Sequence, residues 1–498
     1  MISNIKSTFL IITLLSVHLN LNSQNLYFNK WVLGEAGGVT ISFSESGVEI
    51  SRLPIDANLS GNNSSICDKD GNLLFFFNGC EIIDRSLSVM LNGDGLGHNL
   101  LESEYCSEGI SSPLGQGSIV LPDLLNPNLY YLFYNDFQDI LVEPNFAFTP
   151  GNLYLSTIDI SKNDGLGEVI IKDEIIQKDT FARFGFEATL NSTSDGWWAV
   201  YPFSNSNCYL VININSRGKV NSHTQCLGNK WNNIDLQGQS AFSPDGTKYC
   251  RFIYANGLDL FDFDPENGEL SNPVHIEFDF TDTVSFAGVE FSSNSRFLYA
   301  NTYNKIFQFD LDDEDIIKSR VLVSELEDFD YVIDTKMISS QLAPNGKIYV
   351  GGGAQFSHLH TINYPNCKGV NCKVDQYSVL LDSFPSFSAL SLPNLPTSFY
   401  SIQDIFCDTV VMNNDLRVDE KTLLAPNPCD NEFIVNSNSS SSKKVEIFTL
   451  NGEVIYHEIM YQKSNLISTA SFHNGIYLVK VSDNINKKFF MHKLVVHH

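Results

Sequence analysis

Short runs of alternating apolar and polar residues fill the chain, and the clearest of them recur at a fixed distance. Three copies of one unit, two short strands around a tight turn, occupy residues 239–254, 289–300 and 340–350. In the first copy Pro244 presets φ, Asp245 can bond back to the backbone and Gly246 accepts a positive φ. The turn positions Gly246, Ser295 and Gly346 lie 49 and 51 residues apart. A period of about 50 residues built from strands predicts a β-propeller with one blade per repeat.

The rest of the first 400 residues fits the same plan. Earlier copies of the hairpin lie at 64–79, 117–134 and 186–201. One period beyond Gly346, residues 390–400 are interpreted as a degenerate seventh copy, which opening strands near Trp31 would complete. No long apolar stripe with the 3.6-residue period occurs. The sequence therefore predicts an all-β fold with a seven-bladed propeller over 24–401, and six blades as the alternative.

A separate small β module is predicted at the C-terminal end. Residues 402–422 are polar and acidic and read as a linker, and residues 423–498 return to short apolar strands. Within them, Asn451-Gly452 stands between apolar runs, which is a strong short-range signal for a hairpin.

The first residues have the pattern of a secretory signal peptide, predicted over 1–23. Lys6 supplies the positive charge, residues 9–17 form a short apolar core, and cleavage after Ser23 is expected. This core is too short to span a bilayer, and no later segment has the length of a transmembrane helix. We therefore expect export without transmembrane insertion.

The charge balance narrows the class of partner. The chain has 31 Lys and Arg against 58 Asp and Glu, a formal net charge of −27. A nucleic-acid-binding protein needs a basic surface, so nucleic acid is excluded as a partner, as is docking on an anionic membrane. The acidic surface is interpreted as a means of keeping an exported protein in solution.

The ten cysteines fit an oxidising compartment. Cys367 and Cys372 bracket a short turn that a disulfide could close, and Cys208 and Cys226 lie symmetrically about the turn of a predicted hairpin. We predict these two bridges, and the other six cysteines cannot be paired from the sequence. A zinc site is the competing interpretation, but no second CxxC or HxxxH lies nearby.

Two acidic stretches are candidate metal sites, and the metal they would bind is a structural calcium ion. Residues 310–315 form the densest acidic run, and residues 262–268 imitate a calcium loop, although the glycine falls one position late. Solvated loops or turns between strands explain both stretches. No other cofactor is expected.

Two further pairs are candidate binding residues. Trp197 and Trp198 could stack on a sugar, but neighbours on a strand point to opposite faces, so at least one of them belongs to the core. His358 and His360 share a strand face, but the local sequence offers no third metal ligand. The G-x-S-x-G, P-loop and H-E-x-x-H motifs are absent from the sequence, so no catalytic, cofactor-binding or metal-binding residue is assigned.

The C-terminal module resembles the sorting domain of the Bacteroidetes type IX secretion system. The resemblance rests on Pro-Asn-Pro at 426–428, Val-Glu-Ile-Phe-Thr-Leu-Asn-Gly at 445–452, Asn-Gly-Ile-Tyr-Leu-Val-Lys-Val at 474–481 and Lys-Leu-Val-Val at 493–496. It implies a β-sandwich over 423–498 that the outer-membrane translocon recognises and that is usually cleaved as the cargo is released or attached to the surface.

The body of the chain resembles the propeller of Bacteroidetes surface proteins, and more distantly YVTN and WD-repeat propellers. The shared features include Trp31 and Gly34, Ser-Ile-x-Asp-x-x-Gly-Asn-Leu-Leu-Phe at 65–75, Phe-Asp-Phe-Asp at 261–264 and Leu-Pro-Asn at 392–394. The resemblance brings no catalytic residue with it.

Two functions are compatible with these patterns. The first is a secreted or cell-surface protein whose propeller binds an extracellular protein or glycan through its loops. The second is an exported lyase, lactonase or glycosidase whose active site lies in the central channel. The second function needs ionisable side chains from several blades to converge there, and no such set can be recognised in the sequence.

Overall fold

The computed structural model separates into two compact units, residues 1–407 and 408–498. It describes residues 26–34, 38–44, 47–54, 58–97, 106–107, 111–142, 145–215, 217–230, 238–254, 256–278, 287–326, 335–353, 356–381, 391–400, 407, 422–437, 443–449, 454–460, 464–483 and 488–498. The predicted signal peptide lies outside the described residues, as does nearly all of the predicted linker.

Seven antiparallel sheets make up the described part of the first unit. Two have three strands: β1 (Lys30–Leu33), β2 (Val39–Ser44) and β3 (Gly47–Arg52), then β4 (Ser64–Cys67), β5 (Leu73–Phe77) and β6 (Ile82–Asp84). The third and fourth have four: β7 (Ser118–Pro122), β8 (Leu129–Val142), β9 (Asn145–Asp159) and β10 (Glu168–Gln177), then β11 (Glu187–Leu190), β12 (Gly196–Pro202), β13 (Cys208–Asn215) and β14 (Val220–Cys226). The last three are β15 (Gly238–Phe242), β16 (Lys248–Ile253), β17 (Gly257–Asp264) and β18 (Glu269–Ile276), then β19 (Ala287–Phe291), β20 (Phe297–Thr302), β21 (Lys305–Asp310) and β22 (Val321–Glu325), and β23 (Ser339–Leu342), β24 (Ile348–Gly351), β25 (His358–Ile362) and β26 (Val374–Leu380).

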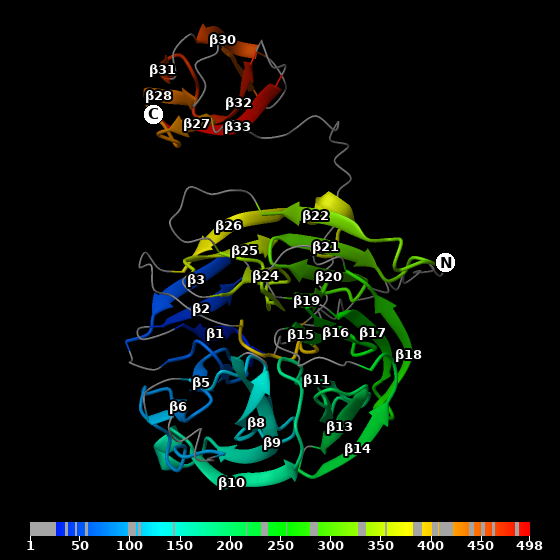
Figure 1. Ribbon diagram of the computed structural model, residues 1–498. Coiled ribbons are helices and arrows are strands. Elements are labelled where there is room, and N and C mark those ends of the chain that lie inside the picture. The colour runs from blue at the N-terminus through cyan, green and yellow to red at the C-terminus, as the bar shows by residue number, and fades with distance from the viewer. Residues whose placement is uncertain are drawn as a thin grey trace, which may run out of the picture. The chain divides into compact units, whose positions relative to one another are not determined.

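The sheets follow one another around a common centre (Figure 1). The first strand of each sheet is innermost: β1 lies beside β4, β4 beside β7, β11 beside β15, and β19 beside both β15 and β23. Large apolar side chains fill the spaces between neighbouring sheets. Helical structure in the described residues is limited to two single 3₁₀ turns, η1 (Asn163–Gly165) and η2 (Gly369–Cys372), and to the helical residues 106–107.

The repeated turns have the conformation that the sequence predicted. Gly246, Ser295 and Gly346 have φ of 71°, 60° and 75°, in the left-handed region. In each turn the amide of this residue donates to the carbonyl three residues earlier, at 2.8 Å, 2.8 Å and 2.9 Å. Ser295 therefore shows that the turn tolerates a non-glycine residue, at a cost in backbone strain.

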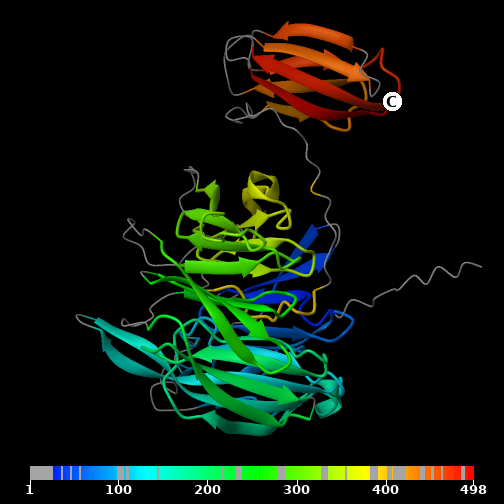
Figure 2. The same ribbon diagram turned by 90° about the vertical axis from the view of Figure 1, so that its right-hand side faces the viewer.

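The third sheet carries an extension that the repeat pattern did not predict. Strands β8 and β9 pair over 14 and 15 residues, and their hairpin projects from the ring (Figure 2). The register shifts between Asn135 and Phe137, at the point where the hairpin leaves the sheet. Such a bulge bends the strand and re-aims it.

Residues 391–400 are not the predicted seventh copy of the hairpin. The strand containing Trp31 pairs with β2 and belongs to a sheet of its own, whereas 391–400 form no strand. The reason is that Pro393 and Pro396 have no amide hydrogen to donate to a ladder. The seventh sheet is instead formed by β1–β3 alone.

One of the two predicted disulfides is present, and the other pairing is wrong. Cys208 and Cys226 face each other in the β13–β14 register and are joined. Cys367 is joined to Cys407, not to Cys372. Cys372 lies in η2 as a buried free thiol, and burial raises its pKa to about 11. The structure adds a bridge between Cys80 and Cys106.

The second unit contains two sheets, β27-β28-β31 and β30-β29-β32-β33. Their strands are β27 (Thr422–Ala425), β28 (Glu432–Ser437), β29 (Lys443–Thr449), β30 (Val454–Met460), β31 (Ser464–Ser468), β32 (Gly475–Asp483) and β33 (Lys488–Val496). Buried residues of both sheets form one apolar cluster, with Phe433 from β28 and Val479 from β32 among them.

Candidate functional site

The channel between the innermost strands is the first place to look for a site, and a segment of the chain itself runs along it. Near the beginning of β23, the Leu392 amide donates to Ser339 Oγ at 3.2 Å. At the far ends of β15 and β11, Thr397 Oγ1 donates to the Phe242 carbonyl at 3.2 Å and Ser398 Oγ accepts the Leu190 amide at 3.1 Å. Residues 391–400, which we call the channel segment, therefore extend from one end of the inner strands to the other. Figure 1 shows this segment at the centre of the ring.

Asn394 is the most extensively bonded side chain of the channel segment. Its Nδ2 donates to the Phe186 carbonyl at 2.7 Å and to the Ser118 carbonyl at 3.0 Å, and its Oδ1 accepts from Gln116 Nε2 at 3.3 Å. The side chain is buried, so these bonds satisfy polar groups that water does not reach. Asn394 thereby joins the channel segment to the third and fourth sheets.

Aromatic contacts continue at the end of the channel segment. The Phe399 ring lies 5.7 Å, 6.0 Å and 5.2 Å from the rings of Tyr27, Phe28 and Trp197. Tyr400, the next residue, is buried in the largest apolar cluster of the molecule's described part. The chain then reaches Cys407, which is bonded to Cys367 beyond β25.

Two glutamines bridge sheets that are not neighbours in the sequence. Gln116 accepts the Ser240 amide at 3.0 Å and donates to the Ser240 carbonyl at 3.1 Å. Gln239 forms the same pair of bonds with Ser340, at 3.0 Å and 2.5 Å. Each side-chain amide thus occupies the place of a backbone peptide across the channel, which fixes the distance between alternate inner strands.

Two carboxyl groups complete the lining of the channel. Glu290 accepts the amides of Phe291 and Leu342, each at 2.8 Å, and burial raises its pKa to about 8. Burial raises the pKa of Glu187 as well, and the charge of Glu290 raises it further. Burial therefore favours the protonated form of both groups, because a buried charge without a counter-charge is costly.

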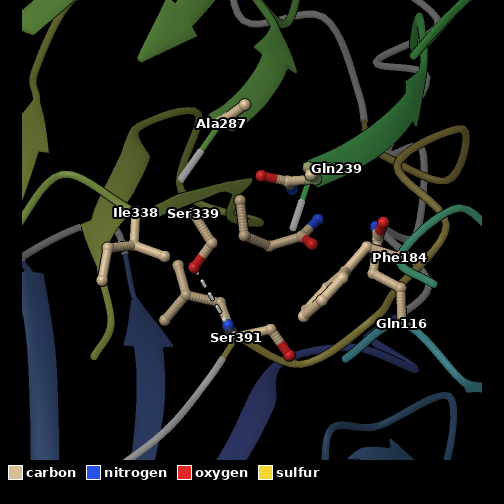
Figure 3. Close-up of a pocket in the computed structure, with 10 residues that line it drawn as sticks. Gln116, Phe184, Gln239, Ala287, Ile338, Ser339 and Ser391 are labelled. Carbon is tan, nitrogen blue, oxygen red and sulfur yellow. Dashed lines mark hydrogen bonds between the residues drawn. The ribbon is translucent and has the colours of Figure 1, made fainter. Parts of the chain in front are cut away.

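A small pocket remains at the end of the channel where the inner strands begin (Figure 3). Its lining includes Gln116, Phe184, Gln239 and Ser339, and residues Ser391 and Leu392 of the channel segment close one side. Its volume is about 10 Å³, which is room for about one water molecule. A substrate or cofactor would need hundreds of Å³.

A larger groove lies at the rim of the ring, beside the last strand of the fifth sheet. It has a volume of about 680 Å³ and is lined by His275, Glu277, Phe278, Ile317 and Arg320. We call it the rim groove. It combines apolar side chains with groups of both charges, which suits a ligand that presents an apolar face and polar substituents.

The imidazole in the rim groove is oriented by a buried carboxylate. His275 Nδ1 lies 2.8 Å from Asp259 Oδ1, and the two side chains are 27% and 2% exposed. Burial raises the pKa of Asp259, and the hydrogen bond with His275 opposes this rise. The pair arises because Asp259 and His275 are register partners on β17 and β18, and Arg251 on β16 is the next partner in the same row.

The guanidinium group in the rim groove is held in place by its neighbours. Arg320 lies over the rings of Phe278 and Phe307, at 5.6 Å and 5.8 Å from their centroids. Its Nη1 donates to the Glu277 carbonyl at 3.2 Å. An arginine ordered in this way loses less conformational entropy when it binds an anionic or hydroxyl-rich ligand.

The acidic stretches singled out in the sequence are used within the protein. Asp310 is buried and bonded to Arg296 at 2.9 Å and to Lys368 at 2.8 Å, and the bond to Arg296 holds its pKa well below the usual range. Asp264 accepts the Glu266 amide inside the turn that joins β17 to β18. Among the described residues, no group of three or more His, Cys, Asp or Glu side chains is placed to hold a metal ion.

The aromatic and histidine candidates are also engaged in the fold. Trp197 and Trp198 are both buried, and their Nε1 atoms donate to the carbonyls of Pro122 and Pro265 at 3.0 Å and 2.9 Å. His360 is buried, lies 3.0 Å from the Thr335 carbonyl through Nε2, and accepts the Tyr377 amide at Nδ1. Both tryptophans and His360 therefore belong to the core.

Comparison with known proteins identifies the second unit. Residues 424–497 match the family model described as a secretion system C-terminal sorting domain. The chain carries a C-terminal sorting domain. This sorting domain indicates export by the type IX machinery to the cell surface or the extracellular space. In the described part of the chain, no helix is both long and apolar enough to cross a membrane.

Other comparisons give only distant similarity. PorZ, a surface component of the type IX secretion system of Porphyromonas gingivalis, has 10% identity, with 96% of this chain and 88% of that one covered, at a TM-score of 0.22. The extracellular domain of BT4673 from B. thetaiotaomicron has 10% identity, with 94% and 63% covered, at a TM-score of 0.28. Chaetomium thermophilum Sqt1 has 11% identity, with 76% and 86% covered, at a TM-score of 0.30. None of the curated proteins is similar to the chain at a significant level.

Proposed function

We propose that the protein is a secreted or cell-surface binding protein that recognises an extracellular protein or glycan. In this proposal residues 1–23 direct the chain into the periplasm, and residues 24–401 form a seven-bladed propeller. Residues 402–422 are a linker, and residues 423–498 form a β-sandwich that the type IX translocon recognises. The seven successive sheets and the sorting domain support this organisation.

The occupied channel is the observation that carries the binding function. An enzyme with its site in the channel needs ionisable groups that a substrate can reach. Glu187 and Glu290 are buried there, and their oxygens accept backbone amides and the Gln116 amide. Because the channel segment fills the remaining space, we place ligand binding on the outer surface of the ring.

The rim groove is the surface that we propose for the ligand. A glycan fits its chemistry, since sugars combine apolar ring faces with hydroxyl groups, and Phe278 and Ile317 would serve the former. Arg320 and Glu277 would bond hydroxyl or carboxylate substituents. A protein loop that presents the same groups is the other ligand class.

Binding to a panel of extracellular polysaccharides, measured by calorimetry on the purified full chain, tests this proposal. We expect Arg320→Ala to weaken binding at least roughly tenfold, because a charge-assisted bond contributes about 1.5–3 kcal/mol. Arg217→Ala is the matched control, since Arg217 is an exposed arginine on the turn between β13 and β14. Equal affinities of the two variants would exclude the rim groove as the binding site.

An exported enzyme is the second candidate function, and the pairing of Asp259 with His275 favours it. A buried carboxylate that orients an imidazole is the arrangement found where histidine acts as a general base. The active site would then lie in the rim groove, not in the channel. Turnover of a polysaccharide or lactone that is lost in His275→Gln while binding persists would support the enzyme over the simple binding protein.

A further inference from the structure

Among the strands that the structure describes, none is shared between the first and the last sheet to close the ring. In each of the seven described sheets the strands are consecutive in the sequence, so the first sheet contains β1–β3 alone and the last contains β23–β26 alone. These two sheets meet through side chains: the Tyr349 ring lies 5.8 Å from that of Trp31 and 5.3 Å from that of Phe43. No described strand of one pairs with the other, so among the described residues the two sheets meet through packed side chains.

The channel segment contacts sheets on all sides of the channel. It bonds to the third sheet through Ser118, to the fourth through Phe186 and Leu190, to the fifth through Phe242 and to the last through Ser339. Gln341, also in the last sheet, donates to the Leu395 carbonyl at 3.3 Å. The Phe399 ring adds contacts with Tyr27 and Phe28, which precede β1.

We propose that the channel is a peptide-binding site whose ligand is the chain's own segment 391–400, and that this segment closes the ring from the inside. The channel binds this extended peptide through the peptide's own Asn394 side chain, through its backbone groups at Leu392 and Leu395, and through its hydroxyls at Thr397 and Ser398.

The composition of the channel segment suits a peptide that must be buried without a β-ladder. Pro393 and Pro396 have no amide hydrogens, so they leave two fewer buried donors to satisfy. Their fixed φ also reduces the entropy that is lost when the segment becomes ordered. The Cys367–Cys407 bond then ties the end of the segment to the last sheet.

Closure has a consequence for export. The channel segment follows all seven sheets in the sequence and precedes the sorting domain. The ring can therefore close only after residues 391–400 have entered the compartment where the chain folds. A chain that is cut short before this point would lack both the closure and the sorting domain.

The test uses the full-length chain with Asn394→Asp and a synthetic peptide of residues 391–400. Aspartate removes the donor that bonds to the carbonyls of Phe186 and Ser118 and places an acceptor against them, so we expect the unfolding temperature to fall by roughly 5 °C. The native peptide, added in excess during refolding, should restore most of this loss in a concentration-dependent manner. A peptide that carries the same Asn394→Asp change should not restore it.

Hydrogen exchange separates ring closure from a local packing role. In Asn394→Asp we expect faster exchange in the first and last sheets, at β1–β2 and β23–β24. Val211→Ala in β13 serves as the control, because Val211 is buried between the fourth and fifth sheets and its loss should affect those sheets. The proposal is overturned if exchange in the Asn394 variant rises only within 391–400, or if the native peptide gives no more recovery than the altered one.

Discussion

A chain that lacks residues 424–498 is expected to accumulate in the periplasm, whereas the full chain leaves it. These residues match the sorting domain, and its two sheets share one apolar core. We propose that the translocon recognises the folded unit, so Val479→Asp should have the same effect as the deletion. Val479 is fully buried in that core, and a buried unpaired charge unfolds a unit of this size. The measurement is the amount and mass of the protein in periplasm, outer membrane and medium.

A truncated chain whose first unit is unfolded would also be retained in the periplasm, so the controls must exclude unfolding of that unit. The first unit has its own core and should remain resistant to protease after the deletion, since the two units are separate. Retained, protease-resistant protein supports the assignment of residues 423–498 as the export signal. Appearance of the truncated chain outside the cell, in the amount seen for the full chain, would contradict it.

Raising the pH from about 5 to about 8 is expected to destabilise the ring through its two buried carboxyl groups. The pKa of Glu290 is raised from an ordinary value of 4.5 to about 8, and that of Glu187 is raised as well. The folded protein therefore keeps protons that the unfolded chain releases near pH 4.5. Since the folded state binds more protons in this window, the free energy of unfolding falls as the pH rises, for Glu290 by roughly 3–4 kcal/mol.

Urea denaturation at pH 5 and at pH 8 measures this effect. Glu290→Gln cannot ionise and should lose most of the difference between the two pH values, while Glu266→Gln, at an exposed turn, should retain it. Asp310 does not interfere, because its pKa is lowered and its contribution is lost only in more acidic solution. A wild-type protein as stable at pH 8 as at pH 5 would show that the channel carboxyls are not buried as described.

The sheets were predictable from the sequence because the residues that specify each hairpin lie close together along the chain. A turn such as Ser243-Pro244-Asp245-Gly246 and the alternating strands beside it specify a hairpin without reference to the rest of the chain. Repetition at about 50 residues then predicts sheets around a centre. The Cys208–Cys226 bridge was predictable for the same reason, since both residues belong to one hairpin.

The channel was not predictable, because its contacts join residues far apart in the sequence. Asn394 bonds to groups more than 200 residues away in the sequence, and Cys407 pairs with Cys367, which lies 40 residues earlier. Residues 390–400 have the apolar pattern of a strand, and only Pro393 and Pro396 indicate that they cannot join a ladder. The polar residues Gln239, Glu290 and Gln341 in otherwise apolar inner strands were the remaining signal for a polar channel.

The rim groove could not be predicted from the sequence for a related reason. Asp259 and His275 are 16 residues apart and become neighbours only through the register of β17 and β18, which is interrupted by a bulge. Arg320 reaches the same groove from beyond the next sheet's third strand. Neither residue lies in a motif that marks it.

One cross-linking measurement tests most directly whether the chain fills its own channel and so acts through its surface. The Leu392 amide lies 3.2 Å from Ser339 Oγ, so cysteines at these two positions should be close enough to form a disulfide. In the double variant Ser339→Cys, Leu392→Cys, peptide mapping without reduction is expected to recover the two segments joined, in protein that folds and binds as the wild type does. If both cysteines are instead alkylated separately in the folded protein, the segment does not lie in the channel, and the channel again becomes the place to look for an active site.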